Sequence, residues 1–151
     1  MGELNDAPTD ASLPLVIQGE PIVVGQANGP ILVSQEPLSF WGGYDYRTGE
    51  IIDRRHPLSG QIAAGRVLAI PFSRGSSTTT AVLLEAVRSG TAPAAIITIG
   101  PDHFFALASI VADEMYQQPI PLVALSTDDF ARLRPGQRAQ IQIDGKVILS
   151  D

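Results

Sequence analysis

The fold is decided by the stretch RVLAIPFSRGSSTTTAVLLEAVRSGTAPAAIITIG, residues 66–100. A short apolar run at 66–71 is followed by the polar loop 72–77 and then by a predicted helix over 78–89, which a glycine ends. A second run at 94–99 is apolar at nearly every position, as in strands buried on both faces of a parallel sheet. The stretch therefore predicts a β-α-β unit at the centre of an α/β domain.

The flanking sequence adds strands on both sides of this unit. Short β-rich runs at 15–17, 22–24 and 31–33 are separated by glycines, which is typical of strands joined by turns. Near the C-terminus, residues 139–149 alternate between apolar and polar around Asp144-Gly145, a dipeptide that favours tight turns. This pattern predicts a closing hairpin.

A second helix is predicted over 102–117, and Pro119 stops it. Its helical spacing is carried by five apolar residues: Phe104, Leu107, Ala108, Val111 and Met115. A third strand is predicted at 122–125, and Ser126 with two acids behind it predicts the capped start of a short helix. The elements complete one mixed α/β domain.

The composition describes a globular chain with few charges. The 151 residues are 44% hydrophobic, which excludes wholesale disorder and provides for one core. Charged residues make up 17%, below the roughly 25% of ordinary soluble domains. A surface poor in charge is expected of a chain that lives against a partner. The net charge of -6 argues against a nucleic-acid or anionic-membrane partner.

The chain contains no cysteine and two histidines, His56 and His103. Without thiols it forms no disulfide and offers no thiolate to zinc or an iron–sulfur cluster, so any metal it serves is expected on another polypeptide. Residues 1–12 are predicted to be a flexible tail and 13–151 the folded domain. No run approaches the length of a membrane helix, and the N-terminus resembles no secretory signal, so a cytoplasmic protein is expected.

The loop before the first predicted helix is the sharpest candidate site. A helix N-terminus offers unpaired N–H groups and partial positive charge, which favour carboxylate or phosphate. Gly75 would allow close approach of a ligand to the backbone, and Arg74 offers a guanidinium fork for an anion. Ser76 and Ser77 are candidates for substrate binding or proton exchange. The alternative is that they only cap the helix.

Two further segments carry candidate residues. Gly43 and Asp45 belong to a shaped loop with two glycines and three aromatics, in which Asp45 either orients a substrate group or forms an Asx-turn. His56 follows two arginines and either acts on a substrate as an acid–base or anion-binding group or belongs to a charged surface loop. Trp41 is expected in a core or interface.

Several stretches, in this order, resemble the small subunit of aconitase X-type hydro-lyases: 39–45, 48–53, 56–60, 74–77 and 92–97. The resemblance spans about residues 15–150. It implies a swivelling β/β/α domain similar to the small domain of aconitase and isopropylmalate isomerase. It also implies a large subunit that carries the iron–sulfur cluster, a small carboxylic-acid substrate, and no activity without the large subunit.

The resemblance assigns roles to the loop. In aconitase and isopropylmalate isomerase, the relatives that the resemblance implies, a Gly-Ser-Ser-Arg-Glu turn carries a serine that acts as the base. Gly75-Ser76-Ser77 matches this turn, with Ser76 as the first candidate for the base and Ser77 as its rival. Thr78-Thr79 stands in place of Arg-Glu, which leaves Arg74 as the candidate anion contact. Gly75, Gly43, Asp45 and His56 complete the expected substrate-binding set.

The family implies dehydration of cis-3-hydroxy-L-proline to Δ1-pyrroline-2-carboxylate, which we expect here, with 5-phosphomevalonate as the alternative substrate. Two other classes stay open. A phosphocarrier swivelling domain would need an exposed, phosphorylatable His56. A non-catalytic module would bind an acid ligand without a large partner.

Overall fold

Eight strands form one sheet in the computed structural model, which describes residues 13–75 and 77–151. The predicted tail, 1–12, lies outside the described residues. In chain order the elements are β1 (Leu15–Gln18), β2 (Glu20–Val23), β3 (Ala27–Val33), β4 (Tyr44–Asp45), β5 (Glu50–Ile51), β6 (Val67–Ala69), α2 (Ser77–Ser89), β7 (Ala95–Ile99), α3 (His103–Tyr116), β8 (Leu122–Leu125), α4 (Thr127–Phe130), β9 (Arg138–Ile141) and β10 (Lys146–Ser150). The order across the sheet is β1-β10-β9-β3-β6-β7-β8-β2.

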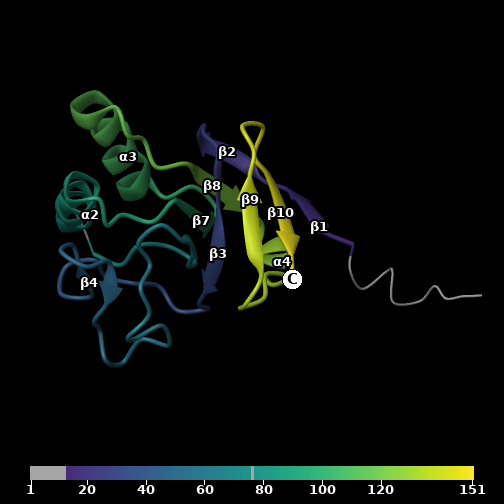
Figure 1. The fold of residues 1–151 in the computed structure, drawn as a ribbon, viewed down its shortest axis with the longest axis horizontal. Helices are drawn as coiled ribbons and strands as arrows, with labels where there is room; N and C mark the ends of the chain where they lie inside the picture. The colour runs from purple at the N-terminus through teal and green to yellow at the C-terminus, as the bar shows by residue number, and fades with distance from the viewer. Residues whose placement is uncertain (1–12, 76) are drawn as a thin grey trace, which may run out of the picture.

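The predicted β-α-β-α-β unit is confirmed. Strands β3, β6, β7 and β8 are parallel neighbours, and helices α2 and α3 lie together on one side of them (Figure 1). Leu68 and Ile96 are buried in the core cluster that includes residues of both helices, whereas Val67 and Ile97 are buried in the cluster shared with the C-terminal hairpin. Because successive strand residues point to opposite faces, both faces of these strands require apolar side chains. The layers are hairpin, parallel strands and helices, a β/β/α order.

The sheet nearly closes on itself at Gly19. Strands β1 and β2 stand at opposite ends of the sheet order but are joined by this one residue. The Gly19 N–H donates to the Gly145 carbonyl at 3.0 Å, which ties the corner to the hairpin turn. A side chain at position 19 would meet Val123 Cγ1, as well as Leu125 Cδ2 at 2.9 Å. Only glycine therefore fits this corner without displacing its neighbours.

One element boundary differs from expectation. The hairpin is confirmed, but β9 ends at Ile141 because the turn spans 142–145, closed by a hydrogen bond from Gly145 N–H to the Gln142 carbonyl. Ile143 is consequently at the exposed tip. The predicted second helix is confirmed as α3 within one residue at each end, and it is closed by Gln117, whose left-handed conformation (φ 53°) lets its N–H bond back to the last turn.

Substitution of Gly19 by alanine is expected to lower the free energy of unfolding by about 1–3 kcal/mol, because the new methyl overpacks the corner. Urea denaturation of Gly19→Ala, Val123→Ala and the double variant measures it. Removing the Val123 atom that meets the methyl should make the double loss smaller than the sum of the single losses. Strictly additive losses would show that the corner has room for the methyl.

Candidate active site

The loop that leads into α2 is held at two points. On one side, Ser73 forms a bridge with Leu38, and the Arg74 N–H donates to the Leu38 carbonyl at 3.0 Å. On the other side, the buried carboxylate of Asp102 accepts the Ser73 N–H at 2.7 Å and the Ser73 hydroxyl at 2.9 Å. The loop is thus fixed between two neighbouring segments before the helix begins.

The same carboxylate caps helix α3. Its Oδ1 accepts the N–H groups of Phe104 at 3.1 Å and Phe105 at 3.0 Å, which have no partners within the helix. Negative charge is also favoured at this positive end of the helix. Asp102 therefore joins the N-terminus of α3 to the site loop through one side chain.

Gly75 adopts a backbone conformation that favours glycine, with φ +114°. The space where a side chain would stand is open, since the nearest heavy atoms to an added Cβ are the hydroxyl oxygens of Ser39 and Thr79 at 3.8 Å and Thr78 at 4.0 Å. Three hydroxyl groups therefore surround the approach to α2, which begins at Ser77. The predicted base Ser76 lies outside the described residues.

Thr79 is the unexpected member of this group. Its side chain is 1% exposed, and Oγ1 has no hydrogen-bond partner within the described part of the chain. Burying a hydroxyl without a partner costs about 1–3 kcal/mol. Thr79 stands where the turn of aconitase and isopropylmalate isomerase has glutamate, so this position holds a neutral hydroxyl without a partner among the described residues.

A basic cavity adjoins the loop. Its volume is about 460 Å³, and its lining residues are Glu36, Pro37, Asp53, Arg54, Arg55, His56 and Arg74. The structure thus brings together two predicted site residues, Arg74 and His56, from separate loops. The three arginines form no salt bridge within residues 13–75 and 77–151. Unpaired guanidinium groups around one cavity suit an anionic ligand.

His56 lines the cavity, and the backbone holds its ring in place. Its Nε2 is 3.2 Å from the Glu36 carbonyl oxygen, and Nδ1 accepts the Leu58 N–H at 3.1 Å. Both ring nitrogens are therefore used by the backbone, with the neutral Nε2-protonated ring satisfying both bonds. The side chain is also buried. The buried ring differs from the charged surface loop that was the alternative for His56, and it counts against a phosphocarrier, which needs an exposed histidine.

Gly43 and Asp45 lie away from the basic cavity, at the β4–β5 hairpin. Oδ1 of Asp45 accepts the Arg47 N–H at 2.9 Å and the guanidinium Nε at 3.2 Å, and these hydrogen bonds hold the pKa of Asp45 below its ordinary value. This geometry is the Asx-turn alternative. At Gly43 a side chain would meet the Ser39 carbonyl oxygen, so glycine is required by packing.

The aromatic residues of this loop divide between core and surface. Phe40 stacks on Tyr44 with ring centroids 4.7 Å apart and meets Phe105 edge-on at 5.3 Å. These three rings attach the loop to α3. Trp41, between them in sequence, is 69% exposed.

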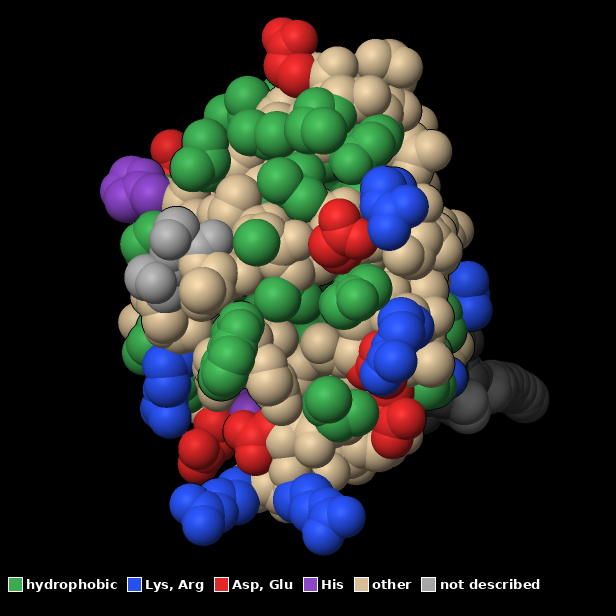
Figure 2. All heavy atoms as spheres, turned by 90° about the vertical axis from the view of Figure 1, so that its left-hand side faces the viewer, with side chains coloured by type: hydrophobic (Ala, Val, Ile, Leu, Met, Phe, Trp, Pro, Cys, Tyr) green, Lys and Arg blue, Asp and Glu red, His purple; other side chains and the backbone are tan. Residues whose placement is uncertain are grey.

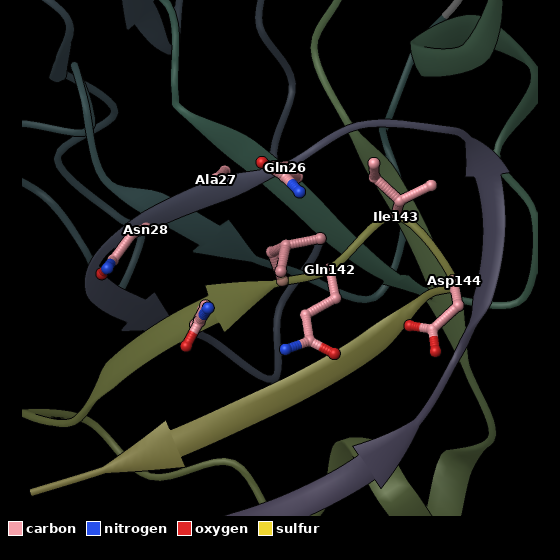
Figure 3. A pocket seen from close by; sticks show the side chains of 8 residues that line it. Gln26, Ala27, Asn28, Gln142, Ile143 and Asp144 are labelled. Carbon is pink, nitrogen blue, oxygen red and sulfur yellow. The ribbon is translucent and has the colours of Figure 1, made fainter.

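A second hollow lies at the hairpin, far from the loop in the sheet (Figure 3). It has a volume of about 500 Å³ and is lined by Gln26, Ala27, Asn28, Gln140, Ile141, Gln142, Ile143 and Asp144. Its polar groups are amides and one carboxylate, and none of the predicted site residues belongs to it. We assign no chemistry to this hollow.

Within the described residues, no three histidine, aspartate or glutamate side chains are grouped as metal ligands. In the same part of the chain, no helix has the length and apolar character needed to cross a bilayer.

The fold and the loop together define a small β/β/α domain that presents a helix N-terminus beside a basic cavity. Residues 16–149 match the family model of the aconitase X swivel domain, and the chain belongs to that family. The resemblance inferred from the sequence motifs is thereby confirmed.

Relatives carry two different names. Cis-3-hydroxy-L-proline dehydratase of Pseudomonas aeruginosa is 50% identical over 104 residues, which are 69% of this chain and 18% of that protein. Phosphomevalonate dehydratase small subunit of Methanothermobacter thermautotrophicus is 41% identical over 109 residues, 72% of this chain and 79% of that one. The crystal structure of Thermococcus kodakaraensis aconitase X in its holo form matches with a TM-score of 0.80 at 32% identity, covering 91% of this chain and 99% of that chain. The chain spans about a fifth of the length of the first curated relatives it matches.

Asp102 is the site residue that motif reasoning missed. Its signal was present, because an aspartate directly before an apolar helical run is a typical N-cap. The same carboxylate also binds Ser73, and no local pattern shows this contact, because it depends on the neighbouring strands being parallel.

Asp102→Ala is expected to lower the free energy of unfolding by about 2–4 kcal/mol, since it removes a helix cap and leaves the buried Ser73 N–H unpaired. Ser126→Ala is the matched control, because Ser126 caps α4 through a single bond to Asp129 N–H and should cost about 1 kcal/mol. Hydrogen exchange should rise at 72–75 in the first variant only. Equal losses and an unchanged loop would contradict the anchoring role.

Gly75→Ala tests the backbone of the loop. Gly60 has φ +87° and, as at Gly75, no crowding around an added Cβ, so Gly60→Ala is the control. Each alanine is expected to cost about 1–2 kcal/mol through backbone strain alone. Gly75→Ala should also increase amide exchange over 73–79, which Gly60→Ala should leave unchanged. An unaltered exchange pattern in Gly75→Ala would show that the loop does not need glycine.

Proposed function

We propose that the chain is the small subunit of a dehydratase that converts cis-3-hydroxy-L-proline to Δ1-pyrroline-2-carboxylate. The single observation that carries this is the Asp102-anchored loop, which presents the N-terminus of α2 beside a cavity lined by Arg74. The substrate assignment is supported by the 50% identity to the P. aeruginosa relative of that name.

The residues of the loop divide the work. Arg74 binds the substrate carboxylate, because its guanidinium lines the cavity and has no ion pair within the described residues. Ser76 removes the α-proton, and Ser77 is the alternative base. An alkoxide needs stabilisation in neutral solution, which the partial positive charge at the start of α2 supplies. Loss of the proton and of the 3-hydroxyl, as water, gives an enamine that tautomerises to the imine product.

The chain itself does not fit an iron–sulfur cluster. It has no cysteine, and its described residues contain no group of three metal-ligating side chains. We therefore assign the cluster to the large subunit, where it would serve as the Lewis acid of the reaction. The chain alone is expected to be inactive.

The second candidate is the small subunit of a phosphomevalonate dehydratase. One observation favours it: Arg54 and Arg55 join Arg74 around the same cavity, a denser basic cluster than the sequence suggested. Three arginines offer more hydrogen-bond donors than a single carboxylate needs, and they therefore suit a phosphate better. The Methanothermobacter relative carries this name at 41% identity.

Co-expression with a large aconitase X-type subunit, followed by assays with both substrates, tests the proposal. Ser76→Ala is expected to lower turnover by about 10²–10⁴-fold, the usual contribution of a general base, with association unchanged. Ser77→Ala, measured in the same assay, tests whether Ser77 is the base instead. Ser89→Ala, at the far end of α2, is the control and should retain full activity.

Near-normal turnover in Ser76→Ala would remove it from the mechanism. Turnover of phosphomevalonate alone would replace the first substrate by the second. Failure of the pair to associate would overturn the subunit assignment itself.

A further inference from the structure

Helix α3 presents large apolar side chains to solvent. Phe104, Leu107, Ile110 and Met115 are between 38% and 58% exposed. The buried side of the helix is formed by smaller residues and one phenylalanine: Phe105, Ala108, Ser109 and Ala112. The apolar spacing that predicts the helix therefore describes mainly its outer side.

The exposed apolar surface continues to the site loop. Phe72, next to Ser73, is 50% exposed, and Trp41, 69% exposed, lies two residues from Ser39, whose hydroxyl oxygen is near Gly75 of the site loop. Figure 2 shows apolar side chains spread across this side of the molecule. We call the set Trp41, Phe72, Phe104, Leu107, Ile110 and Met115 the apolar face.

Two charged pairs lie near the apolar face, whereas Asp113 and Glu114 on α3 form no salt bridge among the described residues. Arg88 donates to Glu85 at 2.8 Å on α2, and Arg47 donates to Asp45 at 3.2 Å near the β4–β5 hairpin. Scattered exposed apolar residues are ordinary, but several large ones gathered on one side of a single helix mark a binding surface. Aromatic residues and methionine are enriched at the centres of such interfaces.

We infer that the apolar face docks the large aconitase X-type subunit, an inference that rests on the proposed function. Two observations identify this occupant. The face begins at Phe72 and Trp41, so a partner seated on it also covers the loop at α2 and can complete the site. In the P. aeruginosa relative, the segment similar to this chain is 18% of a longer polypeptide, which supplies a large remainder for the domain to contact.

The test compares variants of two sides of the full chain. Leu107→Glu/Met115→Glu places two charges on the apolar face. Val16→Glu/Ile143→Glu places two at side chains that are 50% and 54% exposed, on β1 and at the hairpin tip, across the sheet from the helices (Figure 1). Circular dichroism and urea denaturation should show both variants folded, because all four side chains are solvent-exposed.

Isothermal titration calorimetry with the purified large subunit should show binding weakened about 100-fold or more by Leu107→Glu/Met115→Glu, as for substitutions at interface centres. The control should bind within about threefold of the unmodified chain, since exposed substitutions outside an interface have small effects. Trp41→Ala should weaken binding in the same direction. Unchanged affinity in the apolar-face variants would overturn the inference.

The outcomes separate the docking inference from the proposed function. If the two chains bind and turn over substrate but the apolar-face variants bind normally, the proposed function stands and the docking inference is wrong. An unmodified chain that never binds the large subunit removes both. Light scattering of the chain alone supplies the remaining outcome: a dimer that Leu107→Glu/Met115→Glu dissociates would make a second copy the occupant and overturn the inference.

Discussion

The carboxylate of Asp102 is the contact on which the geometry of the site depends. It accepts hydrogen bonds from Ser73 on the loop and from the first turn of α3. An anion satisfies both sets because each consists of N–H or O–H donors for which the described residues provide no other partner. The loop before α2 is therefore positioned by α3 and, through the packing of α3, by the whole helical layer.

The parallel strands of the sheet need apolar cover on both faces, and the fold provides it. The parallel strands are covered on one side by α2 and α3 and on the other by the hairpin and β1, so their apolar residues are fully used by the core. The outer side of α3 is not covered in this way, and its phenylalanine, leucine and methionine remain between 38% and 58% exposed.

The fold could be predicted from local patterns because its decisive elements are buried on both faces. The runs 66–71 and 94–99 are apolar at nearly every position for that reason, and they contain the strands β6 and β7. The outward direction of Phe104 and Leu107 could not be predicted, since helical periodicity identifies a face without saying whether core or partner covers it. The near-closure at Gly19 also depends on pairings across the whole chain.

The candidate loop could be singled out from the sequence, whereas its surroundings could not. Gly75 was expected to allow close approach to the backbone, and in the structure it has a φ of +114° with open space around an added Cβ. The meeting of Arg74 with Arg54, Arg55 and His56 is a tertiary event with no local signature. Among the described residues, the atoms nearest to an added Cβ at Gly75 are the hydroxyl oxygens of Ser39, Thr78 and Thr79, whereas the guanidinium-bearing residues line the neighbouring cavity. Neutral hydroxyls and cationic side chains therefore lie in two adjoining parts of the candidate site.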